Sequence, residues 1–325
     1  MATMKDVANL AGVGVGTVSR YVNNPDSLKE STKVKVEYAI KELDYQPNEY
    51  ARGLKLNKTN SVALIIPSIW HPFFSEFAYY VERTLENYGY KLLLCNSENN
   101  YKKELEYIKM VQQNKVDGII GITYSDIDKY VKSNMPFVSI DRHFKEDVTY
   151  VTSDNAQAGK LAATQLIKNG CKSLAYIGGI PVYESEITKR ASSFLKEAKE
   201  QKINYSSLEI PEPIDRLEEK IEEFILAHPD IDGIFTINDY MGLDVKQCLE
   251  NLGKKVPDDI QIIGCDGIKL SKDRQVIMST IKQPVEEMAV QSVQSLLKTI
   301  NHLPVEKRIV LPVTYIQGDT TKIKD

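Results

Sequence analysis

Regular alternation between strand-like and helix-like segments begins at residue 61 and continues through most of the chain. Short apolar runs typical of buried strands occur at residues 61–67, 91–96, 118–123, 137–141, 173–179, 233–238 and 261–266. Segments with helical apolar spacing occur between these runs, at residues 73–88, 102–114, 157–168, 189–201, 218–227 and 241–252. Repeated β–α units predict a doubly wound parallel sheet. The units are too many for one small sheet, so we predict an α/β fold with two such sheets facing each other across a cleft.

The first 60 residues of the 325-residue chain follow a different pattern. Residues 1–47 have the apolar spacing of three short helices and contain no strand-like run. The apolar face of the third helix is expected to hold Val34, Ala39, Ile40 and Leu43. Residues 48–60 predict a short helix and a linker, and residues 286–300 and 308–316 predict a last helix and a last strand. The sequence thus predicts a small helical domain, a connecting segment and a two-lobed domain.

The start of the chain has the spacing of a helix-turn-helix. Thr3 followed by Asp6 is a capping-box pattern that begins a helix. Gly12 can adopt the positive φ that a tight turn requires, while Val13 and Val18 are placed to face inward. The outer side of the second helix carries the polar residues Thr17, Ser19, Arg20 and Asn23. Such a helix enters the major groove of DNA in helix-turn-helix proteins; the alternative is a helical domain with a solvated polar face.

Composition excludes several classes of protein and leaves DNA binding open. The longest apolar run, residues 62–67, is far shorter than the ~18 residues that span a bilayer. The first residues lack the pattern of a secretory signal, so we expect a cytoplasmic protein. The net charge is −4, but residues 1–60 contain nine Lys/Arg and seven Asp/Glu residues. This weak asymmetry does not by itself indicate a nucleic-acid partner.

The sequence contains no motif of a catalytic or metal site. The cysteines are far apart in the chain, at Cys95, Cys171, Cys248 and Cys265, and the histidines are equally scattered, at His71, His143, His228 and His302. Neither set has the spacing of zinc ligands. The sequence also lacks GxSxG, Walker, HExxH and dinucleotide-binding patterns. We therefore expect no enzyme activity, no metal and no cofactor.

Polar and aromatic residues follow several predicted strands directly. Asp141, Asn238 and Asp266 stand at three strand ends, and an aromatic group follows the first strand at Trp70, Phe73 and Phe74. Ligands of doubly wound sheets bind at the carboxyl ends of the strands. Carboxylates accept hydrogen bonds from pairs of hydroxyl groups, and aromatic faces pack on the C–H surface of a sugar ring. The sequence therefore predicts a polyhydroxylated ligand.

A structural role is the alternative for residues of these types. An aspartate at a strand end often caps the next helix, and we expect Asp154 and Asp239 to be caps or hinge residues. The aromatic residues could belong to the ordinary core, which we expect of Phe77.

The strings MKDVANLAGVGVGTVSRYVNN and YQPNEYARGLK, with the chain that follows them, resemble the LacI/GalR family of bacterial repressors. The resemblance covers nearly the whole chain. It implies a homodimer that binds a near-palindromic double-stranded DNA operator through a headpiece, residues 1–47, and a hinge helix with linker, residues 48–60. It also implies a domain for effector binding and dimerisation, residues 61–325. Lobe one would comprise about residues 61–154 and 284–312, and lobe two about residues 155–283 and 313–325.

The resemblance places Val15 and Gly16 as primary base readers at the start of the recognition helix. Val15 can contact a thymine methyl group, but Gly16 has no side chain that reads a base. Arg20 can bind guanine with two hydrogen bonds, so we expect it to carry much of the direct specificity. Thr17, Ser19 and Asn23 would then contact mainly phosphate.

Further DNA contacts are implied at Thr3, Asn48, Leu54 and Lys55. By resemblance, Leu54 wedges between central base pairs from the minor groove and kinks the duplex. The alternative is that Leu54 packs on a neighbouring residue. Gly53 weakens a helix, which suits a hinge that folds only on DNA.

The resemblance also implies effector contacts at Asp141, Arg190, Asn238, Asp266 and Gln283, to which the local pattern adds Trp70 and Phe73. The family usually has glycine where Ser193 stands, three residues after Arg190. Strings such as IDRHF, VTSDN and IVLPV most resemble repressors of sucrose and related sugar operons. A sugar phosphate is one alternative effector, because arginine suits phosphate. A nucleoside or purine sensor, and a global carbon regulator with a phosphoprotein corepressor, are further alternatives.

Overall fold

The headpiece is built from three α-helices and a short 3-10 turn. In the computed structural model, which describes residues 2–46, 58–183 and 185–323, these are α1 (Met4–Ala11), α2 (Val15–Asn23), η1 (Pro25–Ser27) and α3 (Glu30–Glu42). The Thr3–Asp6 capping box that begins α1 is confirmed, and Gly12 ends the helix with a φ of 66°. The helices pack around Val7, Ala8, Ala11, Val18, Val36, Ala39 and Tyr45.

One prediction for the headpiece is wrong. Val34 is 59% exposed, and Val36 is the valine of α3 that enters the core. Each residue advances a helix by about 100°, so residues two apart lie on nearly opposite sides of the helix. The apolar residues of this helix are spaced so that either Val34 or Val36 could face the core. In the structure α3 packs against α1 with Val36 buried.

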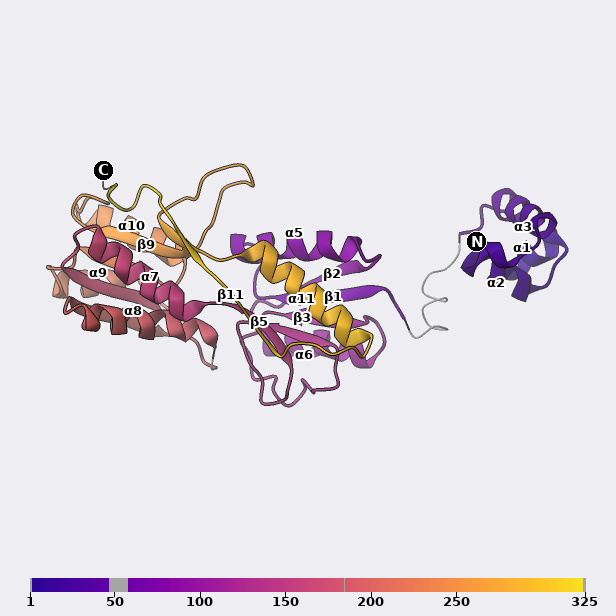
Figure 1. The fold of residues 1–325 in the computed structure, drawn as a ribbon, viewed down its shortest axis with the longest axis horizontal. Coiled ribbons are helices and arrows are strands. Elements are labelled where there is room, and N and C mark those ends of the chain that lie inside the picture. The colour runs from indigo at the N-terminus through magenta and orange to yellow at the C-terminus, as the bar shows by residue number, and fades with distance from the viewer. Residues whose placement is uncertain (1, 47–57, 184, 324–325) are drawn as a thin grey trace. The chain divides into compact units, whose positions relative to one another are not determined.

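The described residues divide into two units, 1–59 and 60–325. The second unit contains two lobes, each with its sheet between helices (Figure 1). The strands of lobe one lie in the order β11-β5-β4-β3-β1-β2. They are β1 (Ser61–Ile66), β2 (Lys91–Asn96), β3 (Gly118–Gly121), β4 (Phe137–Ile140), β5 (Thr149–Ser153) and β11 (Arg308–Leu311). All the pairs in this sheet are parallel.

Helices cover both faces of this sheet because its strands are apolar on both sides. One face packs against α5 (Pro72–Glu86) and α11 (Val285–Ile300), around Phe77 and Leu296. The other face packs against α6 (Tyr101–Gln112), around Ile108 and Phe137. Phe77 is fully buried core, as expected.

The sheet of lobe two has the strand order β12-β10-β9-β8-β6-β7. Its strands are β6 (Ser173–Ile180), β7 (Asn204–Pro211), β8 (Gly233–Thr236), β9 (Gln261–Asp266), β10 (Thr280–Lys282) and β12 (Thr314–Ile316). They are parallel except for β12, which runs antiparallel to β10. One face is covered by α7 (Asn155–Lys168) and α8 (Lys189–Glu200). The 3-10 turn η2 (Glu186–Thr188) directly precedes α8. The other face is covered by α9 (Leu217–Ala227) and α10 (Asp239–Asn251).

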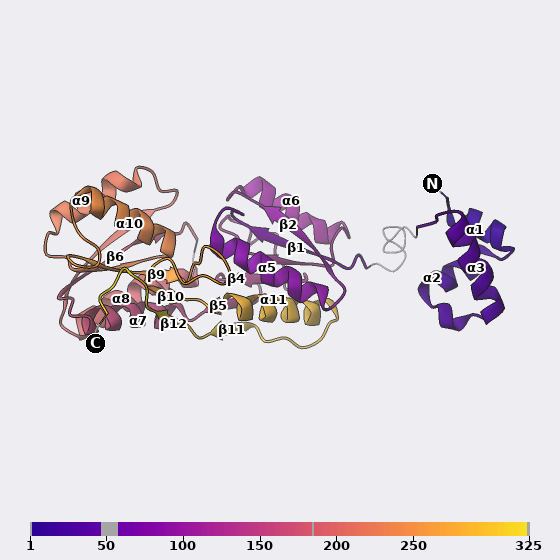
Figure 2. The same cartoon turned by 90° about the horizontal axis from the view of Figure 1, so that it is seen from above.

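The chain passes between the lobes after β5, after β10 and between β11 and β12 (Figure 2). The segment 308–316 is therefore two strands in different sheets, and our prediction of one strand is wrong. The strands β5, β7 and β10 were not predicted from the sequence. In the described parts of the chain, no helix is both long and apolar enough to cross a membrane.

Candidate DNA-binding and effector sites

The second headpiece helix presents an exposed surface at its N-terminal end. Val15 is 45% exposed, and Gly16 and Arg20 are exposed beside it. Gly14 precedes the helix and provides no side-chain cap. The first N–H groups of α2 are thus open to a phosphate or a base, because a helix leaves them without partners inside the helix.

Several predicted DNA contacts already have partners in the headpiece. The Thr3 hydroxyl donates to Asp6 Oδ2 at 2.7 Å, within the capping box of α1. Asn23 Nδ2 donates to the carbonyl oxygen of Ser19 at 2.7 Å. Thr17 is half-buried and Arg20 is exposed. Their DNA contacts remain predictions, and Asn48, Leu54 and Lys55 lie outside the described residues.

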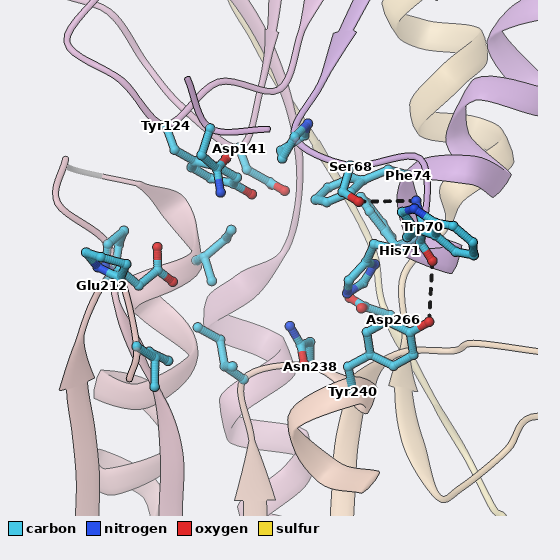
Figure 3. Close-up of a pocket in the computed structure, with 18 of the residues that line it drawn as sticks. Ser68, Trp70, His71, Phe74, Tyr124, Asp141, Glu212, Asn238, Tyr240 and Asp266 are labelled. Carbon is cyan, nitrogen blue, oxygen red and sulfur yellow. Dashed lines mark hydrogen bonds between the residues drawn. The ribbon is translucent and has the colours of Figure 1, made fainter. Parts of the chain in front are cut away.

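A cavity of about 710 Å³ lies between the two lobes. It is bounded by the carboxyl ends of strands from both sheets, where a doubly wound fold binds its ligands. The structure brings all seven predicted effector residues to its lining: Trp70, Phe73, Asp141, Arg190, Asn238, Asp266 and Gln283. Figure 3 shows side chains from both lobes that converge on this space.

A buried arginine, Arg190, lines the cavity. Arg190 is 3% exposed, and its Nη1 lies 4.0 Å from Asp266 Oδ1. Its Nε donates to Asn155 Oδ1, and its Nη1 donates to the carbonyl oxygen of Ile237, both at 2.6 Å. The guanidinium is therefore fixed in place by the protein before any ligand binds.

The Asp141 carboxylate is buried beside this arginine. Burial raises the pKa of Asp141, and the nearby Arg190 and the hydrogen bond from Thr152 oppose the shift. The Thr152 hydroxyl donates to Asp141 Oδ1 at 2.6 Å. Asp141 has a φ of 55°, a conformation that non-glycine residues adopt at a cost and that clusters at functional sites.

Asp266 ends β9 in a similar arrangement. Gln283 Nε2 donates to Asp266 Oδ1 at 2.7 Å, and Gln283 Oε1 accepts from the Ser153 hydroxyl at 2.8 Å. Burial raises the pKa of Asp266 well above its ordinary value, and the neighbouring Asp239 adds to the shift. Asp266 also has a positive φ, of 140°. Gln283 donates to one oxygen of Asp266, as Thr152 does to one oxygen of Asp141, so lone pairs of both carboxylates remain for ligand hydroxyls.

Asn238 lines the cavity and also caps α10, whereas Asp239 does not cap that helix. Asn238 is the N-cap of α10, and its Oδ1 accepts from the N–H of Met241 at 2.8 Å. Its amide nitrogen is left for the cavity (Figure 3). Asp239 is fully buried and accepts from the N–H groups of Gly267 and Ile268, so it fixes the turn after β9. Burial raises the pKa of Asp239 to about 6. Asp154 is a cap, as expected, and accepts from the N–H of Gln157.

An aromatic wall closes one side of the cavity. Trp70 is 87% exposed at the cavity mouth, whereas Phe73 is buried and also belongs to the core of lobe one. The His71 ring lies between Phe74 and Tyr240, with ring centroids 4.9 and 4.7 Å away. Burial lowers the pKa of His71 to about 4, so the imidazole is neutral at pH 7. The Tyr240 hydroxyl of lobe two donates to the carbonyl oxygen of Trp70 at 3.4 Å.

Several lining residues were not predicted from the sequence, among them His71, Tyr124, Glu212 and Tyr240. Tyr124 lies three residues after β3, so the strand-end rule could have found it. Glu212 directly follows β7, which was not predicted. His71 and Tyr240 stand at the starts of helices, where no local signal marks them.

Among the described residues, no cluster of His, Cys, Asp and Glu could hold a metal ion. The four cysteines are buried free thiols. A small helical domain with an open recognition-type helix, joined to two lobes around a polar cavity, defines a ligand-responsive DNA-binding protein.

Comparison with known proteins gives the family. Residues 3–48 match the bacterial regulatory proteins of the lacI family, and residues 59–317 match the periplasmic binding proteins and sugar binding domain of the LacI family. The chain belongs to the LacI family and is a DNA-binding transcriptional regulator. The fold prediction and the resemblance found in the sequence are both confirmed.

Two curated relatives and one solved structure illustrate the similarity. The ribose operon repressor of Bacillus subtilis (strain 168) is 37% identical over 328 residues, covering 100% of both chains. The sucrose operon repressor of Streptococcus mutans serotype c is 36% identical over 321 residues, covering 98% of this chain and 99% of that protein. The structure of the transcriptional regulator CelR in complex with cellobiose has 25% identity and a TM-score of 0.71, and covers 98% of this chain and 100% of that one.

Proposed function

We propose that this regulator represses a carbohydrate uptake or utilisation operon and that a neutral sugar in the interlobe cavity switches its operator affinity. The composition of the cavity supports a sugar as the ligand. Two buried carboxylates, Asp141 and Asp266, stand with Arg190 beside an aromatic wall. Carboxylates accept hydroxyl hydrogen bonds and aromatic rings cover the C–H face of a sugar, so the cavity suits a polyol. The similar proteins named for ribose, sucrose and cellobiose support this class of ligand.

The charges of the cavity favour a neutral sugar over a sugar phosphate. Arg190 already donates to Asn155 and Ile237 and lies near the Asp266 carboxylate. Asp141, Asp266 and Glu212 line the same cavity. A phosphate group would have to compete for the arginine and would be repelled by the carboxylates.

The recognition surface of the proposed operator-binding site is the N-terminal end of α2. Arg20 would bind guanine, Val15 a thymine methyl group, and Thr17, Ser19 and Asn23 mainly phosphate. Thr3, Asn48, Leu54 and Lys55 complete the proposed set.

The functional unit that we propose is a homodimer, which matches a near-palindromic operator. Strand β2 is the edge of its sheet, and Leu93 and Leu94 are exposed on its two faces. Tyr79 of α5 and Tyr88, just after that helix, are exposed as well. An exposed apolar edge strand is a template for association, so a second copy is the expected partner at this edge.

Sugar binding would change the arrangement of the lobes and, through the segment 48–60, the placement of the two headpieces. Couplings of this kind are typically about 1–3 kcal/mol. An inducer weakens operator binding and a corepressor strengthens it. The proposed role needs no catalysis and no cofactor, and we place it in the cytoplasm.

Titration of the purified protein with sugars, followed by tryptophan emission, tests the proposal. Trp70 is the single tryptophan of the chain and lines the mouth of the cavity. D-ribose, sucrose, cellobiose, their phosphates and purine nucleosides would each be added. A saturable change with a neutral sugar, absent in the Asp141→Asn variant, is the expected result. A response only to a nucleoside, or no response at all, would contradict a sugar effector and favour a purine sensor or a protein corepressor.

A further inference from the structure

The loop residues Ser185 and Glu186, which precede α8 in lobe two, are hydrogen-bonded to Asp141 of lobe one. The Asp141 carbonyl oxygen accepts hydrogen bonds from the N–H of Glu186 and from the Ser185 hydroxyl, both at 2.9 Å. Asp141 follows a strand of lobe one, whereas Ser185 and Glu186 belong to lobe two. The Arg142 guanidinium also lies 5.2 Å from the centroid of the Tyr183 ring. The lobes therefore meet through this loop as well as through the chain crossings.

The side chain of Glu186 adds an ionic contact to this junction of the two lobes, which we call the joint. It is 8% exposed, and its Oε2 lies 3.5 Å from Arg308 Nη2 and 2.6 Å from Lys189 Nζ. Burial and the neighbouring Glu186 carboxylate raise the pKa of Tyr150, whose hydroxyl lies beside that carboxylate. Arg308 and Tyr150 stand on neighbouring strands of lobe one, in register with each other. A buried carboxylate needs such partners because an unpaired buried charge is costly.

This joint holds two residues that line the cavity, although Glu186 itself does not line it. Asp141 keeps a φ of 55°, which the surrounding structure must impose. Arg190 follows Glu186 by four residues, in the first turn of α8. Attachment of Glu186 to lobe one thus fixes the Asp141 backbone and the start of the helix that carries Arg190 relative to each other.

We propose that Glu186 is a positioning residue for the effector site. Its carboxylate, held by Arg308 and Tyr150 across the lobe boundary, keeps Asp141 and Arg190 at the spacing that the effector requires. The inference rests on the proposed effector cavity, but the joint itself can be tested without any effector.

Arg308 and Lys189 make a matched pair for this test. Both bind the Glu186 carboxylate, but Arg308 crosses between the lobes and Lys189 lies three residues away in lobe two. Hydrogen exchange of the peptide containing residues 185–188 would be measured in the sugar-free full-length protein. Arg308→Gln is expected to speed exchange of the Glu186 amide by about fivefold, as loss of a ~1 kcal/mol ion pair would do. Lys189→Gln is expected to leave it near the wild-type rate. Equal rates in all three proteins, or faster exchange in Lys189→Gln alone, would overturn the proposal.

The same variants would then be titrated with D-ribose and with sucrose. For the sugar that binds the wild type, Glu186→Gln is expected to weaken binding by about tenfold and Arg308→Gln by about fivefold. The double variant should be no weaker than Glu186→Gln alone, since one interaction is removed in both. Operator affinity without sugar should be unchanged. Additive losses, or unchanged sugar affinity in Glu186→Gln, would refute the positioning role. If neither sugar binds the wild type, the sugar proposal fails while the exchange experiment still decides on the joint.

Discussion

Gly159 of α7 approaches the backbone of Arg190 so closely that a Cβ atom at position 159 would lie 2.2 Å from the Arg190 carbonyl oxygen. The same atom would lie 2.8 Å from the backbone nitrogen of Phe194. Both neighbours are backbone atoms of a packed helix and cannot turn aside. The position of α8, and with it that of the Arg190 side chain, depends on the absence of a side chain at residue 159.

We therefore expect Gly159→Ala to move α8 away from α7 and to disturb the effector site. The free energy of unfolding should fall by about 1–3 kcal/mol, the range for overpacking a core. Urea unfolding followed by circular dichroism measures this loss, and tryptophan emission measures the accompanying loss of sugar affinity. Gln157→Ala, at an exposed position of the same helix, is the control and should behave as the wild type does. An unchanged stability in Gly159→Ala would show that the two helices are not held at this distance.

Arg20→Ala should reduce discrimination between an operator duplex and a scrambled duplex. The guanidinium is exposed on α2, where it can bind guanine with two hydrogen bonds. Loss of such a contact costs about 1–3 kcal/mol, and mostly on the specific sequence. Fluorescence anisotropy with both duplexes, at one fixed salt concentration, provides the measurement. Equal losses on the two duplexes would instead identify Arg20 as a phosphate contact.

Leu54→Ala should abolish a bend in the operator while leaving the fold intact. The prediction follows from the family resemblance, because a leucine wedge unstacks a base step and kinks the duplex. Energy transfer between dyes at the two ends of the duplex reports the bend. A bend of wild-type size in the variant would refute the wedge.

The stability of the two-lobed domain should depend on pH through His71. Burial holds the pKa of His71 at about 4 in the folded protein, below the ordinary value of 6.5. Between these values the unfolded chain binds a proton that the folded chain does not, so stability is present above pH 6.5 and is lost as the pH falls toward 4. Between pH 7 and pH 5 the loss due to this residue is about 2 kcal/mol. Urea unfolding at both pH values should show a smaller difference for His71→Gln than for the wild type. Parallel pH dependence in the two proteins would mean that His71 is not shielded from water.

Much of this architecture could be predicted because its strands are apolar on both faces. The runs that became β1, β2 and β9 stand out from polar surroundings and needed no tertiary information. Two of the missed strands, β7 and β10, lack that signal. In β7, Asn204–Pro211, most residues are exposed or half-buried, and in β10, Thr280–Lys282, only three residues pair. Their strand conformation is imposed by hydrogen bonds to β6 and β9, which local sequence does not report.

Some residues of the candidate site could likewise be predicted from the sequence, and others could not. Asp141, Asn238 and Asp266 could be predicted from their position after predicted strands, together with the topology of a doubly wound sheet. Arg190 and Gln283 could be named only through family resemblance. Glu212 was missed because its strand was missed. The pairing of His71 with Tyr240 brings the two lobes together, and no sequence pattern records a contact between residues so far apart in the chain.

The most direct test of a sugar-switched repressor is operator affinity measured with and without sugar. A duplex selected from a random library by the wild-type protein would be titrated in the absence and presence of D-ribose or sucrose. We expect one neutral sugar to change the operator Kd by about 5- to 150-fold, as a coupling of about 1–3 kcal/mol requires. We expect Asp141→Asn to bind the same duplex but not to respond to the sugar. An operator Kd that no sugar changes, or a response that persists in Asp141→Asn, would contradict the sugar-switched repressor.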